Sequence, residues 1–144
     1  MLIVNTMTKL CADAFLVKDF KIVVDDGRSH SVCLDQPIDE GSDMGPTALE
    51  LCAMSFAGCY VTIFALTMKK MRIPLNELSV TLEAVKSEKE GTITEAKLNI
   101  IVKADARADR IRRAHQLTVK NCPVGVLFEK AGVKIEYNLQ TQQQ

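Results

Sequence analysis

Residues 47–71 read TALELCAMSFAGCYVTIFALTMKKM, and this stretch decides the fold. Thr47 and Glu50 have the T-x-x-E spacing of a capping box, which places the start of a helix at Thr47. The segment between residues 51 and 68 carries no charge. Two lysines follow, where cations suit the helix dipole, and Pro74 stops the helix. The pattern predicts one long helix that is apolar on all sides.

Such a helix is either a membrane span or the centre of a protein core. The uncharged run is close to the minimum length for crossing a bilayer, and polar or small residues interrupt it at Ser55, Gly58, Thr62 and Thr67. The strands predicted on both sides also have apolar faces that need a partner. We therefore expect a core helix, with membrane insertion as the alternative. Because so short a chain cannot cover the helix on every side, we infer a homodimer.

The composition favours a single soluble domain over the whole chain, residues 1–144. Hydrophobic residues make up 47% and aromatic residues only 5%, so the core is expected to be aliphatic. Charged residues make up 25% and the formal net charge is zero, which favours neither nucleic acid nor an anionic membrane as a partner. The first apolar run, residues 2–4, is too short for a secretory signal. We expect a cytoplasmic protein.

The rest of the chain predicts strands and two further helices, and hence an α+β fold. We expect strands and turns over residues 4–35, a loop over 36–46, a hairpin over 77–103, an amphipathic helix over 105–120, a short helix from Pro123 to Gly132, and a last strand through residues 133–137. The glutamine-rich tail after Leu139 is expected to be frayed.

The chain has five cysteines, at positions 11, 33, 52, 59 and 122. Their odd number, irregular spacing and lack of a C-x-x-C motif argue against a secreted disulfide framework and against a zinc site. We therefore expect reduced thiols, no metal and no cofactor. Inert packing is the alternative for each cysteine, because a buried free cysteine often behaves as a small apolar side chain.

Two of these cysteines are candidates for chemistry. Cys122 would be the N-cap of the short helix, where the helix dipole and backbone N–H groups favour a thiolate and lower the pKa; capping alone is the alternative. Cys59 follows Gly58, which costs a helix interior about 1 kcal/mol relative to alanine and indicates a close approach or open space. Cys52 lies about 10 Å from Cys59 along the helix axis, too far for a disulfide. If Cys59 has a redox partner, that partner must come from elsewhere in the chain, and Cys122 is the natural candidate.

Other polar residues give weaker signals. Glu50 is the only carboxylate of the long helix and could orient a cation, although the capping box explains it fully. In an ideal helix it points to the side opposite Cys59. His30 and His115 have no paired ligand or triad spacing and are expected at the surface. The arginines of residues 105–120 are expected on a solvated face.

Two motifs resemble the OsmC-like family, which includes the OsmC and organic hydroperoxide resistance (Ohr) proteins. Gly-Pro-Thr-Ala-Leu-Glu-Leu at 45–51 leads into Ala57-Gly58-Cys59, and Asn-Cys-Pro-Val-Gly at 121–125 resembles the family's second cysteine motif. The order of elements agrees over nearly the whole chain. The resemblance implies an α+β OsmC-like fold, an intertwined homodimer whose long central apolar helices pack between antiparallel sheets, and a site at the dimer interface.

The resemblance also implies thiol-dependent reduction of organic hydroperoxides, with Cys59 as the peroxidatic and Cys122 as the resolving residue. An external dithiol, a lipoylated protein in some members, would reduce the disulfide. Glu50 would take the place of a glutamate that holds an arginine beside the peroxidatic thiolate. The only arginine before Cys59 is Arg28, just after the Asp-Gly turn, so we expect peroxide reduction to be slow or absent. The alternative function is a dimeric binding protein that holds an acyl or thioester ligand at the interface.

Overall fold

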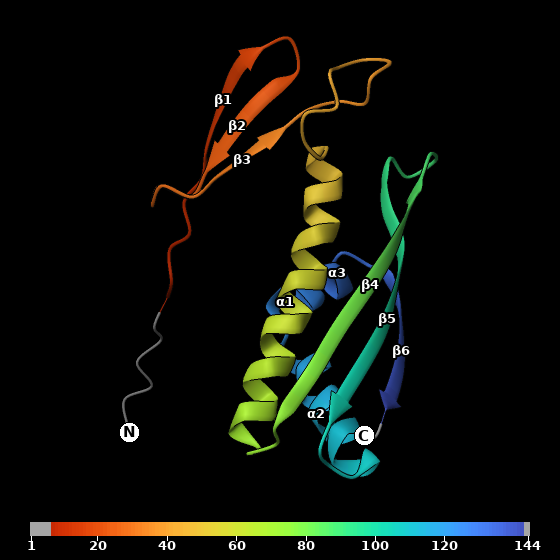
Figure 1. Cartoon of the computed structure of the whole chain (residues 1–144). Coiled ribbons are helices and arrows are strands. Elements are labelled where there is room, and N and C mark those ends of the chain that lie inside the picture. The colour runs from red at the N-terminus through yellow and green to blue at the C-terminus, as the bar shows by residue number, and fades with distance from the viewer. Residues whose placement is uncertain (1–6, 143–144) are drawn as a thin grey trace. The chain divides into compact units, whose positions relative to one another are not determined.

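The computed structural model describes residues 7–142, which form two compact units that meet at residues 51 and 52, in the first turn of the long helix (Figure 1). The elements in chain order are β1 (Asp13–Lys18), β2 (Lys21–Asp25), β3 (Ser31–Leu34), α1 (Ala48–Lys70), β4 (Leu75–Ser87), β5 (Thr92–Ala104), α2 (Ala108–Asn121), α3 (Pro123–Lys130) and β6 (Lys134–Gln142). The predicted mixture of helices and strands is confirmed.

The first unit is an antiparallel sheet in the order β1-β2-β3. Its β2–β3 hairpin pairs Ile22 with Leu34 and Val24 with Val32, and the turn between them contains the predicted Asp26-Gly27, with Gly27 at a positive φ of 76°. The predicted strands and turns are thus confirmed from residue 13 onward, whereas residues 4–6 lie outside the described part of the chain.

The loop before α1 is organised around one buried carboxylate, that of Asp35. Its oxygens accept hydrogen bonds from the backbone N–H groups of Gln36, Ser42 and Met44. Burial alone would raise the pKa of Asp35, but these three donors hold it below its ordinary value. The Asp35 N–H also donates to Pro46. The loop therefore has a fixed path into the start of α1.

The second unit is built on the sheet β4-β5-β6, in which β4 and β5 are antiparallel and β5 and β6 are parallel. The predicted hairpin is confirmed: its apolar face pairs Val80 with Ile100, and Ile100 is completely buried. The prediction of a frayed tail after Leu139 was wrong as far as Gln142, which pairs with Lys103. Parallel pairing with β5 supplies backbone hydrogen bonds that the polar composition of the tail does not reveal.

The three helices lie on one face of this second sheet (Figure 1). A single stripe of α1 is buried there, made of residues four apart: Phe56, Tyr60, Phe64 and Met68. The other sides of the helix are partly or fully exposed to solvent, and Met54 and Leu66 are 55% and 48% exposed. The prediction of burial on every side is therefore not met within one chain. By length and composition alone α1 could also cross a membrane, as can the core helix of a soluble protein, and 22% of its most apolar segment is buried.

Candidate active site

The second unit brings Cys59 and Cys122 together, although they lie 63 positions apart. Cys59 comes from the middle of α1 and Cys122 from the junction of α2 and α3. Their Sγ atoms are 3.3 Å apart, and both thiols are free. A disulfide requires about 2.05 Å, so only a small approach separates this contact from a covalent bond. Cys11, Cys33 and Cys52 are all exposed.

Cys122 is held in place by the end of one helix and the start of the next. Its N–H donates to Thr118 of α2, and its Sγ accepts from the Gly125 N–H of α3 at 3.4 Å. Pro123 follows at the first helical position. The prediction that Cys122 is the N-cap of the short helix is confirmed.

The predicted lowering of the Cys122 pKa, in contrast, was wrong. The side chain is completely buried, and this burial, together with its hydrogen bond to Cys59, raises the pKa of Cys122 to about 11. The hydrogen bond from Gly125 offsets only part of this rise. Because desolvation outweighs the helix terminus, Cys122 is a protonated thiol at neutral pH that donates to the Cys59 sulfur.

Two glycines shape the space around the thiols. A Cβ atom on Gly125 would lie 3.0 Å from the Phe56 ring and 3.5 Å from the Cys122 sulfur, so glycine allows α3 to approach α1 closely here. A Cβ on Gly58 would meet nothing within 4 Å in the described chain. Of the two interpretations of Gly58, the chain shows open space, directly beside the partly exposed Cys59.

Glu50 takes part in the predicted capping box. The Thr47 N–H donates to its carboxylate at 2.7 Å, and the Glu50 N–H donates to the Thr47 hydroxyl at 3.2 Å. The carboxylate is exposed and satisfies the first turn of α1. Its structural role is confirmed, and its role in chemistry stays a prediction.

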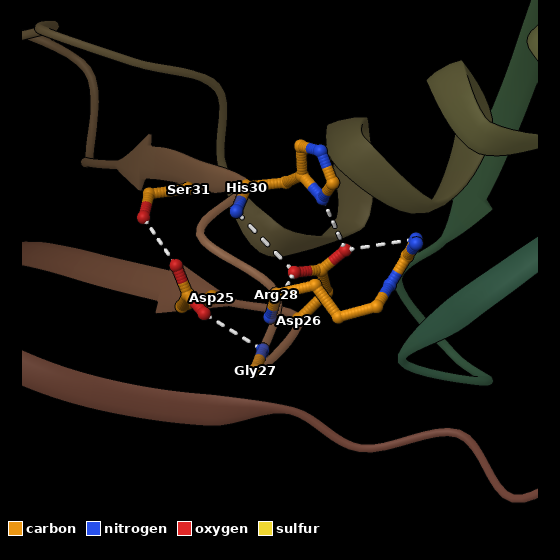
Figure 2. Close-up of polar contacts among 6 residues, drawn as sticks. All are labelled: Asp25, Asp26, Gly27, Arg28, His30 and Ser31. Atoms are coloured by element: carbon orange, nitrogen blue, oxygen red, sulfur yellow. Dashed lines mark hydrogen bonds and ion pairs between the residues drawn. The ribbon is translucent and has the colours of Figure 1, made fainter.

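Arg28 belongs to a local cluster in the β2–β3 turn. Its guanidinium is 78% exposed and lies 3.3 Å from the Asp26 carboxylate, which also contacts His30 Nδ1 at 2.7 Å (Figure 2). His30 is exposed, as predicted. The arginine side chain therefore has a partner within its own turn.

The prediction for His115 was wrong, because this residue is partly buried. Its Nδ1 atom lies 2.6 Å from the Tyr60 hydroxyl, and its ring packs edge-on against Tyr137 with centroids 5.6 Å apart. The sequence did contain a signal: His115 lies four residues after the buried Ile111 and so shares the inner side of α2. The residue type alone does not reveal this burial, because histidine is found both at the surface and in the interior of proteins.

The fold and the two facing thiols define an α+β protein with a dithiol made of one partly exposed and one buried cysteine. A profile described as OsmC-like protein matches residues 41–138, and the chain therefore belongs to the OsmC-like family. This family includes organic hydroperoxide resistance proteins. The predicted resemblance is confirmed. No curated protein matches the sequence.

Solved structures with similar folds agree with this assignment. The OsmC-like protein from Mycoplasma pneumoniae has a TM-score of 0.84 at 18% identity, covering 94% of this chain and 99% of that chain. An organic hydroperoxide resistance protein, OsmC, from Legionella pneumophila has a TM-score of 0.72 at 15% identity, with coverage of 94% and 99%. OhrB of Bacillus subtilis has a TM-score of 0.63 at 17% identity, with coverage of 92% and 98%. The chain is a soluble OsmC-like protein with a long helix and two small sheets.

Proposed function

We propose that this protein reduces organic hydroperoxides by a two-cysteine mechanism, with Cys59 as the peroxidatic and Cys122 as the resolving residue. One observation carries the proposal: the two sulfurs face each other at 3.3 Å from different helices. Membership of a family that includes organic hydroperoxide resistance proteins supports it. The organic hydroperoxide would be the substrate and an external dithiol, such as a lipoylated protein, the reductant.

The proposed cycle has three steps. The Cys59 thiolate attacks the terminal peroxide oxygen, the O–O bond breaks, and the alkoxide takes up a proton and leaves as an alcohol. This leaves a sulfenic acid on Cys59. The Cys122 thiol then attacks that sulfur, its proton and the hydroxyl leave as water, and a disulfide forms. The external dithiol returns both cysteines to thiols by exchange and is itself oxidised to a disulfide.

The different surroundings of the two thiols support this division of roles. Cys59 is partly exposed and lies beside the open face at Gly58, where a peroxide can approach. Cys122 is completely buried, and its raised pKa keeps it protonated and poorly reactive toward peroxide. It becomes useful once Cys59 presents an electrophilic sulfur at contact distance.

We also propose that the protein is a cytoplasmic homodimer. The apolar side chains that α1 leaves exposed, Met54 and Leu66, would be covered by a second copy. Five reduced cysteines are typical of a reducing compartment. We expect sedimentation equilibrium at micromolar concentration to give twice the chain mass of 15.9 kDa. A monomer at that concentration would contradict the dimer.

The function is tested by treating the reduced protein with one equivalent of cumene hydroperoxide and measuring its mass. We expect a loss of two hydrogens, mapped by peptide analysis to a bridge between Cys59 and Cys122. A stable gain of one oxygen on another residue, or no change, would contradict the proposal. An unchanged mass, together with a bound acyl compound seen by native mass spectrometry, would favour the alternative of a ligand-binding protein.

A further inference from the structure

A hydrogen-bonded pair of side chains joins the two helices that carry the thiols. Tyr60 directly follows Cys59 in α1 and is completely buried. Its hydroxyl lies 2.6 Å from Nδ1 of His115 in α2. His115 is two helical turns before Cys122, at the end of the same helix. The pair therefore links α1 and α2 close to both sulfurs.

The surroundings of the pair fix the direction of its hydrogen bond. Burial lowers the pKa of His115 and raises the pKa of Tyr60, so both groups are neutral at pH 7. Tyr60 then donates its O–H to Nδ1, which leaves the His115 proton on Nε2. A neutral donor and a neutral acceptor at this distance form a strong contact within the second unit.

We propose that the Tyr60–His115 hydrogen bond positions Cys59 and Cys122 for disulfide formation. A disulfide forms only within a narrow range of separation between the two backbones. Linking α1 at the residue after Cys59 to the inner side of α2 restricts that separation. Tyr60 and His115 are thus positioning residues, and the biological purpose of this role rests on the proposed peroxide reduction.

The same cluster contains a second phenol, which packs against His115 but does not hydrogen bond to it. Tyr137 of β6 lies 6.0 Å from Tyr60 and 5.6 Å from His115, measured between ring centroids. Burial raises the pKa of both phenols. Only Tyr60 hydrogen bonds to the imidazole among the contacts of the described residues. Tyr137→Phe is therefore a matched control for Tyr60→Phe.

The positioning role has a pH dependence. The groups that face His115 are Tyr60 from α1 and Tyr137 from β6, and both are neutral phenols. Protonation of His115 turns Nδ1 into a donor and ends its bond with Tyr60. Because burial places the His115 pKa below 6.5, the bond is present at neutral pH and is lost as the pH falls through that lowered value.

The test is a redox titration of the protein against dithiothreitol and its oxidised form, at pH 7 and at a series of lower pH values. At pH 7 we expect the equilibrium constant for the Cys59–Cys122 disulfide to fall about tenfold in Tyr60→Phe, which is about 30 mV for a two-electron couple. Tyr137→Phe should stay within about twofold of the wild type. As the pH falls through the lowered His115 pKa, the difference between the wild type and Tyr60→Phe should disappear. His115→Gln, whose amide oxygen accepts from Tyr60, should keep a pH-independent constant near that of the wild type.

The outcomes separate this inference from the proposed function. Equal constants for the wild type and Tyr60→Phe at pH 7 would overturn the positioning role. A wild type that forms the disulfide in the titration but ignores peroxide would overturn the proposed function alone. A wild type that forms no such disulfide would overturn both.

Discussion

Turnover of cumene hydroperoxide with a dithiol should cease in Cys59→Ser, and Cys122→Ser should stop after a single chemical step. The serine hydroxyl at position 59 is too weak a nucleophile to open the peroxide bond, so its rate should fall to that of the buffer. Without Cys122, Cys59 still reacts once and remains a sulfenic acid, because no thiol lies within contact distance to condense with it. The measurement is peroxide consumed per chain, with a dimedone adduct to reveal the sulfenic acid.

Cys52→Ser is the matched control for these variants. Cys52 lies on the same helix, is exposed, and is seven residues from Cys59. We expect it to keep wild-type turnover. If Cys59→Ser and Cys122→Ser both retained turnover as well, the chemistry would not belong to this dithiol.

The sequence predicted those parts of the fold that depend on neighbours along the chain. Thr47 and Glu50 satisfy each other's backbone donors within one turn, so their spacing alone specified the start of α1. The N-cap position of Cys122 before Pro123 was readable for the same reason. Both motifs also pointed to the two cysteines that the structure brings into contact, because the family resemblance attaches to these local patterns.

What the sequence missed depends on residues that are distant along the chain. The contact of His115 with Tyr60 spans 55 positions, and no spacing rule predicts it. The pKa of Cys122 was predicted in the wrong direction because the helix terminus is visible in the sequence, whereas the burial that outweighs it is a property of the packed core. The pairing of β6 with β5 depends equally on tertiary structure.

The presence of an arginine near Cys59 is likewise not specified by the fold. A fold shared at 15–18% identity with these solved structures specifies the backbone, while activity depends on the groups around the reacting sulfur. Arg28 has a carboxylate partner in its own turn. Slow or absent peroxide reduction therefore stays a prediction.

Substitution of Phe56, which packs beside the α3 N-terminus that holds Cys122, is expected to have the largest effect on stability. Phe56 is completely buried, its ring lies 4.8 Å from that of Phe128 in α3, and it is also the side chain closest to Gly125. Phe56→Ala would remove this ring and leave a cavity between α1 and α3. We expect the free energy of unfolding to fall by about 3–5 kcal/mol, measured by urea denaturation.

Leu127→Ala provides the comparison for Phe56→Ala, because Leu127 lies beside Phe128 on α3 but is 63% exposed. Its effect should stay within about 0.5 kcal/mol. The cavity left by Phe56 would lie directly beneath the turn that holds Cys122, so the α3 N-terminus should relax and the dithiol should form its disulfide less readily. A loss of stability below about 1 kcal/mol for Phe56→Ala would mean that α3 does not depend on α1 for its position, and the 3.3 Å contact between the sulfurs would then need another source.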